Sequence, residues 1–420
     1  MPCSSRHAVC VLTFLLPLSA AVPAATAEQG QWARFRGPNG AGISDANAMP
    51  VRWSEADYKW TVRLPGTGHG SPVVWQGRVF LTCTQQRTAT RMVLCLAASD
   101  GRELWRKEFR GRPHKQHKDN SYASSTPAVD AENVCVTWAT PKQVTLLALD
   151  HDGEQKWRRD LGPLDSMHGS GNSPIIYKDL VVLPNDQQGK AFLIAVDRRT
   201  GKTRWQVPRR SALTPASTPC VFRLADGRDT LVFTTTAHGI SGVDPATGRT
   251  VWEIPDVFLD RCVGSPICAG RLVIASFGFG RKGTRLVAVR PDECDAKGRP
   301  RIAWDLKRSV PLVPTSLVKD GRAFLWSDDG TISCMDAPTG KLIWRHRVKG
   351  EFYSSPICVA GRLYCITKKG EVVVIAAAGE FKLLGRTPLG EPTYATPAVA
   401  DGTMYLRTRT RLMALGRKKK

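Results

Sequence analysis

The chain has 420 residues, of which 42% are hydrophobic and 8% aromatic. A chain of this length and composition can bury a large core, which excludes both a wholly disordered protein and a small domain held together by disulfides. Lys and Arg outnumber Asp and Glu by 60 to 37, and the resulting net charge of +23 would attract anionic polymers and lipid headgroups without specifying a fold.

The first 27 residues have the pattern of a secretion signal. Arg6 and His7 precede an apolar run over residues 9–22 that is too short to span a membrane, and small residues follow it. We therefore expect residues 1–27 to be a signal peptide cleaved near Ala27, and the mature protein to be periplasmic or secreted. No cysteine follows a lipobox-like triplet and no second apolar stretch is long enough, so the sequence predicts neither a lipid anchor nor a transmembrane segment.

Residues 28–56 precede every repeated unit and are expected to form an N-terminal leader segment. The next residues, 58–64, alternate in hydrophobicity around Trp60 and predict a strand that has no repeat of its own.

From Ser71 onward the chain repeats one unit. Each copy opens with Ser or Thr, usually before Pro, and continues as two apolar runs around a Gly turn, which is the pattern of a β-hairpin. A third run rich in Val, Ile and Leu follows, and successive copies begin 40 to 55 residues apart. They begin at Ser71, Thr126, Ser173, Thr218, Ser265, Thr315, Ser355 and Thr396.

A fourth strand in each copy is marked by a Trp that follows a tight Gly turn, as in the segment from Asp244 through Gly248 to Trp252. The indole ring of Trp is large enough to fill the space between neighbouring sheets. We therefore assign the repeated Trp, Gly and Asp a structural role. In the seventh copy Leu383 replaces Trp, and we expect a weaker contact there. The Trp register is kept by Trp105, Trp157, Trp205, Trp252, Trp304 and Trp344.

The eighth copy stops at residues 414–416, where its fourth strand should begin. The unassigned strand at 58–64 would supply the missing one, which closes the ring and leaves no open sheet at either end. We therefore predict an all-β fold, an eight-bladed β-propeller of four-stranded blades over residues 57–416 that is closed by the N-terminal strand. A basic tail at 417–420 follows.

Ten cysteines remain after residue 27, and most stand singly in apolar, strand-like runs. Buried free thiols are the simpler interpretation of such positions. A disulfide is the alternative in an exported protein. Its best candidate is Cys83 with Cys95, because a hairpin centred on Ala89 would place them opposite each other.

The repeated Ala-x-Asp-x-x-Thr-Gly-x-x-x-Trp unit resembles the tryptophan-docking repeat of the pyrroloquinoline-quinone-like (PQQ-like) β-propellers over residues 58–416. The leader from Trp32 to Gly42 is also similar to the segment before the first blade in exported bacterial members. The resemblance implies one of two functional classes. One is the quinoprotein dehydrogenases of alcohols or sugars, and the other is non-catalytic scaffolds similar to the outer membrane assembly factor BamB.

Quinoprotein dehydrogenases need a stacked quinone, a calcium-type ion and an Asp that acts as a base. This sequence has no Cys-Cys pair, no Cys-x-x-Cys-His motif and no long insertion that would build a pocket. We therefore favour a monomeric, exported scaffold without a cofactor that binds an envelope protein or an anionic polysaccharide. The alternative is a PQQ-dependent oxidoreductase with PQQ and calcium in the central funnel. The positive charge is scattered and no reader motif is present, so we expect no nucleic acid partner.

Residues just before each innermost strand should surround the central funnel, where propellers usually bind small ligands. Aromatic rings and hydrogen-bond donors there could hold an anionic or sugar-like ligand, with Arg261 as a fixed charge. The alternative is that these side chains only satisfy backbone groups in tight turns. The candidates are His69, Asn120, Tyr122, Ser124, His168, Asn172, Arg261, Tyr353 and Tyr394.

Two further motifs carry weaker signals. His114 and His117 have a spacing that could present two imidazoles to a metal, but the interleaved Lys115 and Lys118 favour a solvated basic loop. The run Asp328-Asp329-Gly330 could suggest calcium binding, but its place between two apolar runs favours a hairpin turn.

Overall fold

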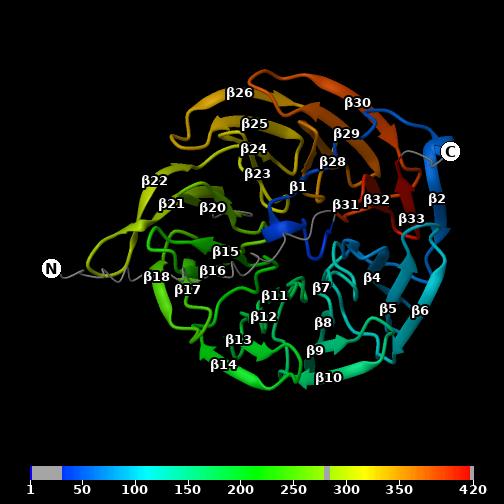
Figure 1. Cartoon of the computed structure of the whole chain (residues 1–420), viewed down its shortest axis with the longest axis horizontal. Helices are drawn as coiled ribbons and strands as arrows, with labels where there is room; N and C mark the ends of the chain where they lie inside the picture. Colours follow the sequence, from blue (N-terminus) through cyan, green and yellow to red (C-terminus); the bar gives the residue numbers. More distant parts are fainter. Residues whose placement is uncertain (2–30, 279–283, 417–420) are drawn as a thin grey trace.

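The computed structural model describes Met1, residues 31–278 and residues 284–416, and it confirms the predicted eight-bladed β-propeller (Figure 1). Residues 2–27 of the proposed signal peptide and the basic tail lie outside the described residues. Within the described part, no helix is both long and apolar enough to cross a bilayer.

The blades follow one another around the ring, each running from an innermost to an outermost strand. Blades 1 to 3 are β3 (Val73–Trp75), β4 (Arg78–Gln85), β5 (Thr90–Ala97), β6 (Glu103–Phe109); β7 (Ala128–Val129), β8 (Val134–Thr140), β9 (Gln143–Leu149), β10 (Gln155–Asp160); and β11 (Ile175–Tyr177), β12 (Leu180–Asn185), β13 (Phe192–Asp197), β14 (Thr203–Pro208). Blades 4 to 6 are β15 (Cys220–Arg223), β16 (Asp229–Thr235), β17 (Gly239–Val243), β18 (Thr250–Ile254); β19 (Ile267–Ala269), β20 (Leu272–Gly278), β21 (Thr284–Cys294), β22 (Pro300–Leu306); and β23 (Leu317–Lys319), β24 (Arg322–Trp326), β25 (Thr331–Asp336), β26 (Leu342–Arg347). Blade 7 is β27 (Ile357–Val359), β28 (Arg362–Ile366), β29 (Glu371–Ala376), β30 (Leu383–Pro388), and blade 8 is β31 (Ala398–Ala400), β32 (Thr403–Arg407), β33 (Arg411–Leu415) with β2 (Tyr58–Arg63).

Blade 8 joins the two ends of the chain, as predicted. The N-terminal strand β2 pairs antiparallel with β33, with Tyr58 opposite Leu415 and Trp60 opposite Ala414. Figure 1 shows this seam, where the blue strand β2 lies beside the red strand β33. Strand β33 is therefore paired on both sides at the point where the ring closes, and β2 is the outermost strand of the blade.

The repeated tryptophans dock each blade onto the next one. The indole nitrogen of Trp157 donates to the backbone oxygen of Arg198 at 2.9 Å, in the turn between the third and fourth strands of the following blade. A Cβ on Gly201 of that turn would meet the Trp157 ring at 2.7 Å, so only Gly allows the ring to lie there. The same donation to the next blade is made by Trp60, Trp105, Trp205, Trp304 and Trp344.

Two blades depart from this docking for visible reasons. The strand β21 is 11 residues long and shifts register before its turn. Among the described residues the buried indole nitrogen of Trp252 has no hydrogen-bond partner, and the Trp252 ring covers Gly242 of its own blade. Leu383 of blade 7 faces blade 8, whose third and fourth strands come from opposite ends of the chain and so share no turn. Leu383 is 46% exposed.

The Ser and Thr residues that open the repeats form a ring of hydrogen bonds around the channel. Seven of the eight hydroxyls accept from the backbone N–H of the preceding blade's Ser or Thr at 2.9 to 3.0 Å, so neighbouring blades are tied together beside the axis. The donor and acceptor pairs are Ser71–Thr126, Thr126–Ser173, Thr218–Ser265, Ser265–Thr315, Thr315–Ser355, Ser355–Thr396 and Thr396–Ser71.

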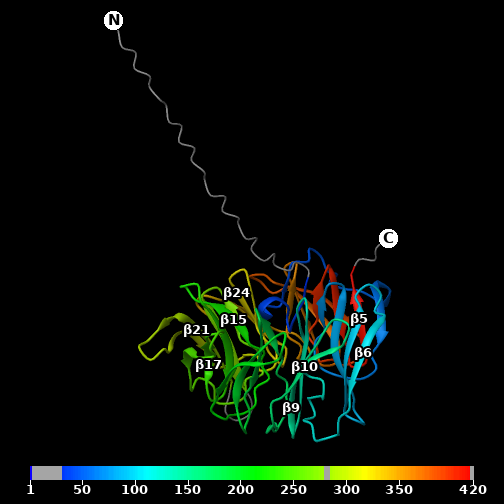
Figure 2. The ribbon, with the colours of Figure 1, turned by 60° about the horizontal axis from the view of Figure 1, so that its bottom comes forward.

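The leader crosses the centre of the ring, where Figure 1 shows β1 (Ile43–Ser44). Its backbone pairs with innermost strands of blades 1, 2 and 7, through Trp32 with Val74, Ala33 with Val129 and β1 parallel to β27. Arg36 is fully buried and donates to the backbone oxygens of Ser316 and Pro356 at 2.9 and 3.0 Å. The leader therefore fills one end of the channel, which is the upper side of the ring in Figure 2.

The ten described cysteines are free thiols, and eight of them are buried, as the simpler interpretation predicted. The alternative pairing of Cys83 with Cys95 is wrong. The β4–β5 hairpin places Cys83 opposite Met92 and Cys95 opposite Phe80, because its register differs from that of a hairpin centred on Ala89.

Candidate functional site

The other end of the channel opens into a funnel of about 440 Å³. The segments before the innermost strands line it, together with Phe35 of the leader and most of the Ser and Thr ring. Seven of the nine predicted site residues meet here: His69, Asn120, Ser124, His168, Arg261, Tyr353 and Tyr394.

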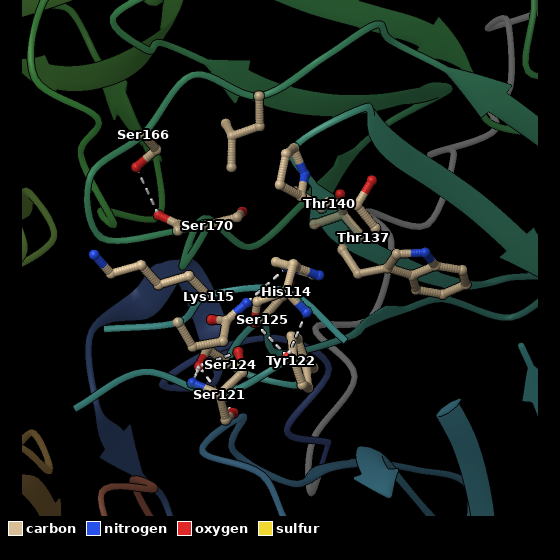
Figure 3. Close-up of a pocket in the computed structure, with 16 residues that line it drawn as sticks. His114, Lys115, Ser121, Tyr122, Ser124, Ser125, Thr137, Thr140, Ser166 and Ser170 are labelled. Atoms are coloured by element: carbon tan, nitrogen blue, oxygen red, sulfur yellow. Dashed lines mark hydrogen bonds between the residues drawn. The ribbon is translucent and has the colours of Figure 1, made fainter. Parts of the chain in front are cut away.

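Tyr122 and Asn172 lie outside the funnel. Tyr122 is 9% exposed and lines a smaller neighbouring pocket, where its hydroxyl donates to the backbone oxygen of His114 at 2.5 Å (Figure 3). Asn172 is 5% exposed, and its amide donates to the backbone oxygen of Pro184 at 2.9 Å. Both side chains therefore hold loops in place, which is the alternative that the sequence left open.

Sequence reasoning missed two contributions to the funnel. The loop after β6 was expected to be solvated, but it folds inward so that His117, Lys118 and Asp119 line the funnel. Lys368 comes from the turn between β28 and β29. Because strands alternate in direction, that turn lies at the same end of the blade as the segment before the innermost strand, and the pair Lys368-Lys369 before Gly370 is the signal that could have indicated it.

Lys368 is the centre of a compact cluster. Its ammonium lies 4.3 Å from the centroid of the Tyr353 ring and 5.5 Å from that of Tyr394. Asp119 lies 3.7 Å from the same ammonium and accepts a hydrogen bond from the Tyr394 hydroxyl at 3.0 Å. Burial alone would lower the pKa of Lys368, but Tyr353, Tyr394 and Asp119 together raise it, so this lysine is charged.

Two histidines of the funnel, His69 and His168, are uncharged at neutral pH. Burial, followed by repulsion from Arg407 and Arg409, lowers the pKa of His69 to about 4, and its ring packs on Tyr394 with centroids 4.5 Å apart. Burial, followed by Arg261 and His117, also lowers the pKa of His168. These imidazoles therefore offer neutral hydrogen-bonding groups.

Fixed charge in the funnel is mostly positive. Lys118, Arg261 and Lys368 line it, while Asp119 is the one carboxylate among the described lining residues, and it is already paired with Lys368. Burial lowers the pKa of Arg261, as expected for a cation partly withdrawn from water. The arrangement can hold an anion through charge, aromatic faces and neutral donors.

The residues present do not fit a quinone held with calcium. Calcium takes six to eight oxygen ligands, but Asp119 is engaged by Lys368 and Tyr394. The side-chain oxygen of Asn120 accepts from the Ser121 N–H and the Ser124 hydroxyl. Across the described residues, no group of three or more His, Cys, Asp or Glu side chains is placed to hold a metal ion.

The Asp328-Asp329-Gly330 segment forms a hairpin turn, as predicted. The Asp328 carboxylate accepts from the backbone N–H groups of Leu312 and Val313 at 2.8 and 3.2 Å, which anchors the loop before the innermost strand of blade 6. Burial raises the pKa of Asp328 to about 6. Its role is to position the funnel wall.

Comparison with known proteins finds similarity to members of both classes. A curated outer membrane protein assembly factor BamB from Yersinia pestis is 21% identical over 300 residues, 68% of this chain and 72% of that protein. The crystal structure of BamB from Moraxella catarrhalis has a TM-score of 0.62 and 15% identity, over 86% of this chain and 97% of the other. The quinohemoprotein alcohol dehydrogenase from Comamonas testosteroni has a TM-score of 0.66 and 12% identity, over 94% and 82%.

At these identities the solved structures show the common fold alone. The sequence model of one protein family shows more than the fold. It matches residues 52–217, 189–293 and 296–380, which together cover most of the chain. The chain therefore belongs to the family described as outer membrane protein assembly factor BamB.

Proposed function

We propose that this protein is an exported, non-catalytic scaffold of the bacterial envelope that binds an acidic segment of a protein partner in the mouth of the funnel. The carrying observation is the charge of the funnel, in which three basic side chains face a single carboxylate that is already paired. Membership of a family described as an assembly factor supports a protein partner over a small substrate.

The position of the leader supports ligand binding at only one end of the channel. It fills the opposite end through backbone pairing and the buried Arg36, so a ligand enters from the loop side. The tyrosines and neutral histidines would contact the partner's backbone and apolar groups, and Lys118 and Arg261 its carboxylates.

Fluorescence anisotropy with a labelled Glu-rich peptide tests this proposal. Replacing both Lys118 and Arg261 by Ala should weaken binding at least about tenfold, since hydrogen bonds to charged groups contribute about 1.5–3 kcal/mol each. The matched control replaces Lys202 and Arg249, which lie exposed in turns of blades 3 and 4, and removes the same charge without touching the funnel. Equal weakening in both double variants would show only nonspecific attraction and would contradict the proposal.

Two further probes separate the alternatives. Binding of heparin fragments but not of the peptide, with the same dependence on Lys118 and Arg261, would assign the funnel to an anionic polysaccharide. A rise in Tm with PQQ and calcium, together with dye reduction by alcohols or aldoses, would instead establish a quinoprotein oxidoreductase. Either result would overturn a protein-binding funnel.

A further inference from the structure

Two cysteines of neighbouring blades meet at the leader end of the channel. Cys220 is the first residue of β15 and Cys268 is the middle residue of β19, and their Sγ atoms are 3.8 Å apart. Cys220 is 1% exposed, whereas Cys268 is partly exposed. The two thiols thus face each other from separate sheets, and one of them can be reached from solvent.

The leader surrounds this pair with polar groups. Asn39 is exposed, binds the backbone N–H and oxygen of Val221 at 2.7 and 2.8 Å, and places its amide nitrogen 3.9 Å from the Cys268 sulfur. Arg34 also lies beside the thiols, and its Nε is buried without a hydrogen-bond partner among the described residues. The Arg34 charge would stabilise a thiolate on either cysteine.

The two thiols are not equivalent. The hydrogen bond with Cys220 lowers the pKa of Cys268, and the Asn39 amide and the Arg34 charge lower it further. The same hydrogen bond, followed by burial, raises the pKa of Cys220. Cys268 is therefore the better nucleophile of the pair, because the thiolate is the reactive form.

We propose that Cys220 and Cys268 form a disulfide when the folded protein meets a small disulfide oxidant such as oxidised glutathione. The Cys268 thiolate attacks one sulfur of the oxidant, which forms a mixed disulfide and releases one thiolate. The Cys220 sulfur then displaces the second oxidant thiolate from Cys268 and passes its proton to that leaving group. Two cysteine thiols are oxidised, and one oxidant disulfide is reduced to two thiols.

The bond would join blades 4 and 5 directly beneath the leader. It would close a loop between residues 220 and 268, and such a cross-link stabilises a protein mainly by restricting its unfolded chain. This inference does not depend on what the funnel binds.

The test uses the whole mature chain, purified with reductant and then titrated with oxidised glutathione. In a Cys294→Ser background, where the exposed cysteine cannot add glutathione, we expect a mass loss of about 2 Da, because two hydrogens leave. Peptide mapping should recover residues 220 and 268 in one cross-linked species, and Tm should rise by roughly 3–6 °C. Cys294→Ser is the background of choice, since Cys294 is the exposed one of the ten described cysteines and is where we expect glutathione to add without forming the cross-link.

Single variants make the result decisive. Cys268→Ala should abolish both the cross-link and the rise in Tm, and Cys220→Ala should trap glutathione on Cys268. Cys294→Ser should still form the cross-link. Failure to recover the 220–268 species under conditions that modify Cys294 would overturn the proposal, and so would a stable mixed disulfide on Cys268 while Cys220 is present.

Discussion

His69 is a neutral group in a funnel whose other polar side chains are partly charged, and its surroundings determine this protonation state. Arg407 is fully buried, donates to the backbone oxygen of Gly70, and carries its charge close to the His69 ring. With the pKa of His69 lowered to about 4, the imidazole stays neutral at physiological pH. The positive side chains that line the funnel are Lys118, Arg261 and Lys368, of which Lys368 is paired with Asp119.

The same shift predicts a pH effect on stability. Between pH 6.5 and 4 the unfolded chain binds a proton at His69 that the folded chain does not, so the free energy of unfolding falls as the pH is lowered through this window. His69→Gln should remove up to about 3 kcal/mol of that loss. Urea unfolding at pH 7 and pH 4.5 measures it, with His346→Gln, outside the funnel, as the control. Identical pH profiles for His69→Gln and the unmodified protein would disprove the assignment.

At the scale of the strand and turn, the docking tryptophans hold adjacent blades together. Trp157→Ala removes a side chain that is 6% exposed and leaves the Arg198 oxygen without its donor, so the free energy of unfolding should fall by about 3–5 kcal/mol. Leu383→Ala, at the equivalent position with no turn to dock on, should cost less than about 1 kcal/mol. Chemical denaturation compares the two, and similar losses would contradict a docking role.

The blades and the strand that closes them could be predicted because the sequence pattern of a blade repeats along the chain. The Trp register, the Gly turns and the unmatched strand around Trp60 predicted eight blades and their closure. The inward fold of residues 117–119 could not be predicted, since the path of a long loop depends on contacts with distant blades. The predicted register of the β4–β5 hairpin was also wrong, because the hydrophobic alternation of two strands does not determine the length of the turn between them.

Across the whole molecule, the leader acts as a brace because it binds several blades at once. Arg36→Met would leave the oxygens of Ser316 and Pro356 buried without a donor, and we expect a loss of about 2–4 kcal/mol in the free energy of unfolding. Arg52→Met, at an exposed position of the same segment, should change it by less than about 0.5 kcal/mol. Differential scanning calorimetry of the two variants distinguishes them, and equal Tm values would show that the leader is only loosely held.

The seam of blade 8 also sets the order in which the molecule can be assembled. Tyr58–Arg63 leaves the ribosome before blades 1 to 7, whereas its partner Arg411–Leu415 is made after them. Blades 1 to 7 can form as their strands emerge, but the circle cannot close until residues 411–415 have been made. A product that stops before residue 411 would carry every blade but the eighth, and would present a bare sheet edge to its neighbours in the cell.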